Sequence, residues 1–109
     1  MRTFEFGKSY EEIDIAGKTY QIDMSDKAIK EYQIAINKYH KEAQKLESVE
    51  ISKLDFEEQK VKFNEAMQLQ KNFIETILGK GTFDELYEKS GKSSSNMVEL
   101  VVFLGEIIG

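Results

Sequence analysis

Residues 12–23 have the sequence EIDIAGKTYQID, and this stretch decides the first part of the fold. Apolar and polar residues alternate in 12–15 and again in 19–23, which is the period of a β-strand with one buried face. Between the two runs, residues 16–18 supply a turn, because Gly17 accepts a positive φ without a steric penalty. The pattern therefore predicts a β-hairpin.

A hairpin needs further structure to cover its apolar face, because two isolated strands are only marginally stable in water. We expect helices to provide that cover, and Thr3–Phe6 is also predicted to add an edge strand before Gly7. The length of 109 residues indicates one domain over residues 1–109. Within it we predict a hairpin region at residues 1–24 and a helical region at 25–109.

The first long helix is predicted from about Lys27 to Leu46. Ser25 or Asp23 is expected to cap it, because both side chains accept hydrogen bonds from the free N–H groups at a helix start. The apolar residues recur at alternating spacings of three and four, which indicates a core-facing stripe. The stripe consists of Ile29, Tyr32, Ile36, Tyr39, Ala43 and Leu46. The same spacing is that of a coiled-coil seam, so dimerisation through this helix stays an alternative.

The second long helix is predicted from about Phe56 to Leu78. It ends there because Gly79 and Gly81 suit the left-handed conformation that follows a helix. Most of its large apolar residues share one predicted core face, with Gln70 in the middle. That face consists of Phe56, Phe63, Met67, Ile74, Ile77 and Leu78.

A short helix, Phe83–Ser90, follows the two glycines. Thr82 and Glu85 match a capping box, in which the hydroxyl and the carboxylate each accept an N–H group of the first turn. A last, apolar helix is predicted at Asn96–Ile108. The fold class is therefore predicted as α+β, mainly α, with an N-terminal hairpin, two long helices, a short helix and an apolar C-terminal helix.

The composition excludes several classes of protein. The chain has 15 Lys+Arg against 20 Asp+Glu, a net charge of −5, whereas nucleic-acid binding needs clustered positive charge. With no Cys and one His, we predict no disulfide, no thiolate zinc site and no other metal site. No apolar run reaches the roughly 20 residues of a membrane span, and the N-terminus lacks the apolar region of a signal peptide. We therefore expect a cytoplasmic protein that binds neither membrane nor nucleic acid.

Candidate catalytic patterns have structural explanations. The pattern Gly-Lys-Ser/Thr occurs three times, but a phosphate-binding P-loop needs a Gly five residues earlier, where Arg2, Glu12 and Leu86 stand. These repeats are interpreted as turns. The single histidine, His40, has no carboxylate one helical turn away. Because nucleophile, base and orienting group do not occur together, we predict a non-enzymatic protein without catalytic residues or cofactor.

The last helix carries more apolar surface than one core contact requires. Its Met97, Leu100, Val101, Leu104, Ile107 and Ile108 form one broad face. Val98, Val102 and Phe103 extend that face, so Glu99 and Glu106 leave only a narrow polar line. Such a helix is either sandwiched inside its own domain or covered by another chain. Under the second interpretation we predict an interface with a partner or a homo-oligomer. Its residues are Val98, Val102, Phe103 and Ile107.

Three stretches resemble a known family. They are IDIAGKTYQID at 13–23, ILGKGTFDELYEKSGKS at 77–93 and the apolar MVELVVFL at 97–104. In this layout the chain resembles the tail assembly chaperones of long-tailed phages and prophages of Gram-positive bacteria.

The resemblance implies a protein that binds the very long tape-measure protein in the host cytoplasm and keeps it soluble. It also implies that the chaperone helps the tail tube to polymerise around the tape measure and leaves before the tail is complete. Two alternatives stay open from the sequence. One is a self-associating head or tail protein that remains in the virion. The other is a small helical regulatory module that dimerises through residues 29–46.

Overall fold

The computed structural model describes residues 1–109 and is mainly helical, with one small antiparallel sheet. The α+β, mainly α fold class is therefore confirmed. The elements in chain order are β1 (Tyr10–Ile15), β2 (Lys18–Asp23), α1 (Asp26–Glu47), the 3-10 turn η1 (Ile51–Lys53), α2 (Phe56–Leu78), α3 (Thr82–Lys89) and α4 (Ser94–Ile108).

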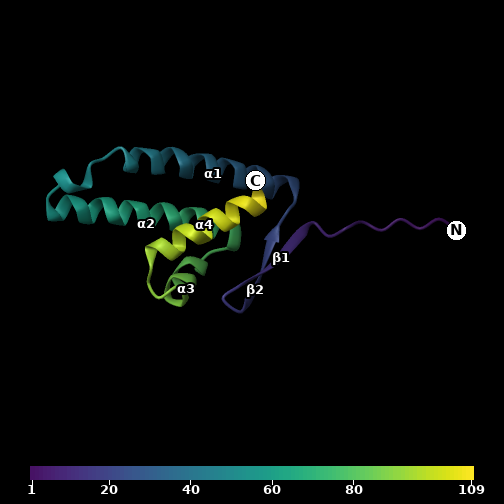
Figure 1. Ribbon diagram of the computed structural model, residues 1–109. Helices are drawn as coiled ribbons and strands as arrows, with labels where there is room; N and C mark the ends of the chain where they lie inside the picture. Colours follow the sequence, from purple (N-terminus) through teal and green to yellow (C-terminus); the bar gives the residue numbers. More distant parts are fainter.

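The two long helices form an antiparallel pair that gives the molecule its length (Figure 1). The helix α4 lies along one side of this pair and contacts both α2 and α1. The short helix α3 and the β-hairpin lie at the end of the pair opposite η1. The core therefore occupies one half of the helical pair, and the half near η1 extends beyond it.

The β-hairpin closes through a tight turn at Ala16 and Gly17, both with positive φ, 51° and 84°. Two such residues match the twist of antiparallel strands. The carboxylate of Asp14 accepts a hydrogen bond from the Gly17 N–H at 3.0 Å. In the ladder, Ile13 faces Tyr20. The strand β2 packs on the helices, and β1 is the outer strand.

The predicted edge strand at Thr3–Phe6 is wrong. The regular pairing ends with a hydrogen bond from the Met24 N–H to the Ser9 carbonyl, at 2.8 Å. Residues 1–8 then run away from the body as an extended arm (Figure 1). The alternating pattern specifies an extended chain, but a strand also needs a ladder partner. The arm continues away from β1 without the reversal that would bring it to the edge of that strand.

The boundaries of the long helices follow from local capping. The Ser25 hydroxyl accepts a hydrogen bond from the Ala28 N–H at 3.3 Å, which confirms Ser25 as the cap of α1. Asp23 supports this turn by accepting the Ser25 N–H at 2.9 Å. The Asp55 carboxylate accepts the Glu58 N–H at 2.8 Å and begins α2.

The core lies where α1, α2, α3, α4 and β2 meet. Tyr39 of α1 contacts Phe73 of α2, with ring centroids 5.4 Å apart. Phe73 is almost fully buried although it lies outside the predicted α2 face. The largest fully buried side chains are Phe73, Ile22, Ile74, Met97 and Leu104. Five elements therefore contribute to one cluster, in which α4 is an integral part.

Part of the predicted core face of α2 is wrong. Phe56 and Phe63 are 73% and 50% exposed. They precede Ile74 by close to whole numbers of helical turns, so they do point to the side of α2 that α4 covers. However, α4 begins opposite Gln70, whose amide nitrogen lies 3.5 Å from the Ser94 carbonyl. Nothing covers the first half of α2 on this side.

The predicted capping box at the start of α3 is also wrong. The N-cap is Gly81, in a left-handed conformation, and no side chain of α3 caps the helix. Instead, the Glu75 carboxylate reaches from α2 and accepts the N–H groups of Gly81 and Phe83, at 3.1 and 3.3 Å. The Thr82 hydroxyl donates backwards to the Gly79 carbonyl. The Glu75 carboxylate of α2 therefore caps the start of α3, in place of the Thr82 and Glu85 pair that the sequence predicted.

Replacing Gln70 by methionine is expected to raise the free energy of unfolding by about 1 kcal/mol. Gln70 is 4% exposed, and its side-chain oxygen has no hydrogen-bond partner. Methionine has a similar shape and removes this unsatisfied oxygen at the cost of one long hydrogen bond. Urea unfolding measures the change. Gln68→Met, at an exposed position of the same helix, is the matched control. Equal changes in the free energy of unfolding for both variants would show that the unsatisfied Gln70 oxygen is not the cause.

Candidate partner-binding surfaces

The helix α4 is fixed at its start by a serine cap. The Ser93 hydroxyl accepts a hydrogen bond from the Asn96 N–H at 3.2 Å, so α4 begins two residues earlier than predicted. One side of α4 is buried in the core. It consists of Met97, Val101, Leu104 and Ile108. This side fixes the rotation of the helix, and with it the residues that face outward.

Three of the four predicted interface residues lie on the surface. Val98, Val102 and Phe103 are 43%, 55% and 41% exposed, so α4 is not sandwiched on all sides within its own chain. Ile107 is half-buried and packs against the core. The three exposed residues are called the α4 outer face below.

Charge divides the α4 outer face. At about 100° per residue, Val98 and Val102 lie on one shoulder of the helix and Phe103 on the other. Glu99 and Glu106 are exposed between the two shoulders. The helix contains no basic residue. A partner that covers this face therefore meets two apolar ridges separated by negative charge.

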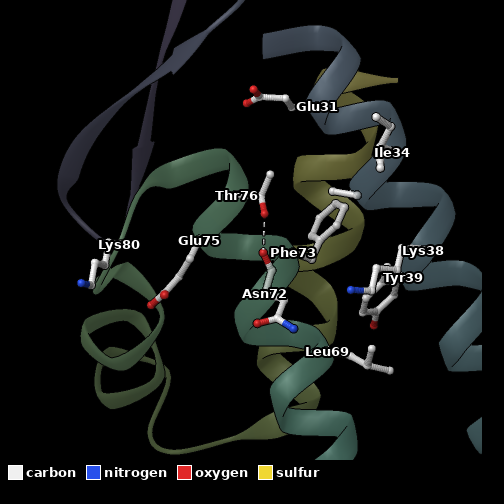
Figure 2. A pocket seen from close by; sticks show the side chains of 11 residues that line it. Glu31, Ile34, Lys38, Tyr39, Leu69, Asn72, Phe73, Glu75, Thr76 and Lys80 are labelled. Atoms are coloured by element: carbon white, nitrogen blue, oxygen red, sulfur yellow. Dashed lines mark hydrogen bonds between the residues drawn. The ribbon is translucent and has the colours of Figure 1, made fainter. Parts of the chain in front are cut away.

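A groove runs between α1 and α2 on the side of the pair opposite α4, which passes behind it in Figure 2. Its volume is about 480 Å³. Ile34, 69% exposed, stands at the edge of the groove. The lining residues are Glu31, Ile34, Ala35, Lys38, Tyr39, Leu69, Asn72, Phe73, Glu75, Thr76 and Lys80.

The groove combines an apolar floor with charged edges. Tyr39 and Phe73 form part of the floor, and burial raises the pKa of the Tyr39 phenol, with a smaller contribution from Glu47. The Thr76 hydroxyl donates to the Asn72 carbonyl at 2.7 Å (Figure 2). Lys38, at the edge, forms no ion pair. Such a groove can accept one face of an amphipathic helix.

The groove was not predicted from the sequence. Its most exposed apolar residue, Ile34, lies off the stripe of α1, and a single exposed isoleucine carries little information. Leu69 likewise lies outside the predicted face of α2. Together these two residues are a weak signal for a second apolar side on the helical pair. Only the antiparallel pairing of α1 and α2 brings them to one groove.

The Gly-Lys-Ser/Thr repeats lie in turns or in the arm. Lys18 follows the hairpin turn, and Lys92 has a φ of 56° in the loop between α3 and α4. Gly7 and Lys8 of the remaining repeat lie in the N-terminal arm, and its Ser9 directly precedes β1. His40 is exposed on α1. No cluster of three or more His, Asp or Glu side chains that could hold a metal ion is found.

The acidic residue Glu85 ties α3 to the β-hairpin. Its carboxylate lies 3.0 Å from the Lys18 ammonium and 3.5 Å from that of Lys89. The hydrogen bond with Lys18 lowers the pKa of Glu85 from its ordinary 4.5, and the same bond raises the pKa of Lys18 from 10.5. Burial, followed by the Glu85 charge, raises the pKa of Tyr20 beside this pair.

We expect Lys18→Met to move the pKa of Glu85 back toward its ordinary value, as followed by NMR titration of the carboxylate. Since the pKa of Glu85 is lowered in the folded state, its contribution to stability is present above pH 4.5 and disappears as the pH falls through the folded pKa. The contribution of Lys18 disappears as the pH rises above 10.5 through its own raised pKa. An unchanged Glu85 pKa in the variant would exclude Lys18 as the cause.

Comparison with protein-family models, curated proteins and solved structures finds no match for the chain. No helix combines the length and the apolar character that crossing a membrane requires. The function therefore has to be argued from the surfaces described above.

Proposed function

We propose that this protein is a non-enzymatic tail assembly chaperone of a phage or prophage, which binds the tape-measure protein in the bacterial cytoplasm. The observation that carries the proposal is the α4 outer face, because the other side of the same helix is fully engaged in the core. The choice of the tape-measure protein as the partner is supported by the resemblance of residues 77–93 and 97–104 to such chaperones.

The α4 outer face suits a helical partner. Its two shoulders can pack against apolar residues on both sides of a basic line of a second helix, and burial of apolar surface stabilises such contacts by about 25 cal/mol per Å². Glu99 and Glu106, which lie between the shoulders, favour a partner helix with Lys or Arg in the middle of the contact. An unassembled tape measure is expected to expose such helical surface over its great length. Covering that surface keeps the tape measure soluble.

The groove between α1 and α2 supports the same mode of binding. It lies on the other side of the helical pair, so one molecule offers two separate surfaces that are suited to helices. A chaperone with two such surfaces can contact two segments of a long partner, or one segment and a second chaperone. Linked contacts of this kind raise the overall affinity without requiring a large single interface.

Co-expression with the tape-measure protein of the same phage tests the proposal. We expect the tape measure to be insoluble alone and to form a soluble complex with this protein. Mass spectrometry of purified phage particles is expected to detect no stoichiometric amount of it, because a chaperone leaves before the tail is complete.

Two outcomes would contradict the proposal. If the tape measure stays insoluble and no complex is recovered, binding to this partner is excluded. If the protein is present in finished particles in stoichiometric amounts, it is a virion component, which is the alternative from the sequence.

A further inference from the structure

The N-terminal arm, residues 1–8, has the pattern of a strand without a partner. Phe4 and Phe6 are 78% and 89% exposed. Their rings contact each other edge to face, with centroids 4.8 Å apart, so both side chains lie on the same side of an extended chain. Two neighbouring phenylalanines that are this exposed leave apolar surface in water, which is unfavourable. The arm is therefore suited to pairing with a sheet.

The outer strand β1 offers an edge for such a pairing. The sheet has two strands, and β1 exposes a row of unpaired N–H and C=O groups on the side away from β2. Its inward-facing Ile13 and Ile15 are only half-buried, whereas Tyr20 and Ile22 of β2 are 6% and 0% exposed. A third strand beside β1 would complete the cover of the apolar face.

The arm matches this edge in side-chain pattern. When Glu5 lies beside Asp14, Phe4 and Phe6 lie beside Ile13 and Ile15 on the inward face, in either strand direction. A parallel strand pairs Phe4 with Ile13, and an antiparallel strand pairs it with Ile15. The apolar pattern thus specifies the register without depending on the direction.

The charges of arm and edge are also complementary. The arm carries Arg2 and Lys8 against one acidic residue, Glu5. The strand β1 carries three acidic residues and no basic one. None of these residues takes part in an ion pair within the molecule. In the register above, Glu5 and Asp14 repel each other, whereas Arg2 in a parallel strand, or Lys8 in an antiparallel one, lies beside Glu11. The net charges of the arm and of β1, +1 and −3, are still opposite and draw the arm toward a β1 edge.

We propose that the arm of one molecule adds as a third strand to the free edge of β1 in a second copy of this chain. The arm does not reach its own β1 edge, because Ser9 is already paired with Met24 and the preceding residues lead away from the body. A second molecule supplies the edge without any reversal of the chain. This inference does not depend on which protein covers the α4 outer face.

The mass in solution is the first test. Light scattering on the full-length protein is expected to give at least twice the 12.6 kDa of one chain. The variant Phe4→Ser/Phe6→Ser is expected to return to the mass of one chain. Phe56→Ser, which makes the same change at a similarly exposed phenylalanine outside the arm, is the control and should keep the wild-type mass. A monomeric wild type, or an arm variant with unchanged mass, would overturn the proposal.

Engineered cysteines test the register, since the chain has no Cys of its own. Glu5→Cys mixed with Asp14→Cys is expected to form a covalent heterodimer on oxidation. Glu5→Cys mixed with Gln21→Cys is the control, because Gln21 lies on the same outer face but on β2. Equal yields with both, or no heterodimer at all, would overturn the proposal. So would a Glu5→Cys/Asp14→Cys double variant that forms its disulfide only within one chain.

Discussion

Replacing Leu104 by alanine is expected to lower the free energy of unfolding by about 3 to 4 kcal/mol. Leu104 is completely buried on the inner side of α4. Removing its side chain leaves a cavity in the buried core cluster to which it belongs, and a packed core closes such a cavity only partly. The loss is large for a domain of this size, whose total stability is about 5 to 15 kcal/mol. Urea or thermal unfolding measures it.

Val102→Ala is the matched control for this experiment. Val102 lies two residues earlier on the same helix but is 55% exposed. Its truncation is expected to change the free energy of unfolding by less than about 0.5 kcal/mol. Equal destabilisation by the two variants would show that α4 is rotated differently from the description given above.

The double variant Val102→Lys/Phe103→Lys is expected to weaken binding of the tape-measure protein by at least about 100-fold, or about 3 kcal/mol. Both side chains lie on the α4 outer face, on opposite shoulders of the helix. Two lysines there would place ammonium groups where an apolar ridge of the partner packs, and burying an unpaired charge is unfavourable. The fold is expected to persist, because neither residue belongs to the buried side. Affinity is measured by titration, and helicity by circular dichroism.

The control is Gln33→Lys/Asn37→Lys, which adds the same two charges at exposed positions of α1. This control is expected to bind like the wild type. Equal loss in both variants would indicate a general effect of charge, and unchanged binding in Val102→Lys/Phe103→Lys would exclude the α4 outer face.

Local patterns predicted the secondary structure well, because the interactions that set it are close in sequence. The alternation around Gly17 predicted the hairpin, and Ser25 was among the two expected caps of α1. The inner side of α4 also followed from helical spacing. In each of these cases the residues that form the pattern lie within a few positions of one another.

Which apolar side chains are covered by another element could not be predicted in the same way. This depends on where helices and strands that are distant in the sequence begin and end. Phe56 and Phe63 have the periodicity of a core face, yet α4 begins too late to reach them. The start of α3 depends on Glu75, which no pattern around Thr82 reveals. The same holds for the arm, whose alternation predicted an extended chain but not whether a strand edge lies beside it.

The candidate binding surfaces include features that the local sequence pattern predicts and features that depend on distant elements. Exposure of Val98, Val102 and Phe103 followed from an apolar arc too wide for one core contact. Ile107 lies at the margin of that arc and turns toward the core. The groove between α1 and α2 depends on the pairing of two helices, so no single helix predicted it.

The central claim is that the α4 outer face contacts the tape-measure protein, and photo-crosslinking tests it most directly. A benzoylphenylalanine in place of Val102 is expected to crosslink to the co-expressed tape measure, whereas the same probe in place of the exposed His40 is not. Crosslinks from position 40 with none from position 102, or no crosslink to the tape measure from either position, would contradict the account.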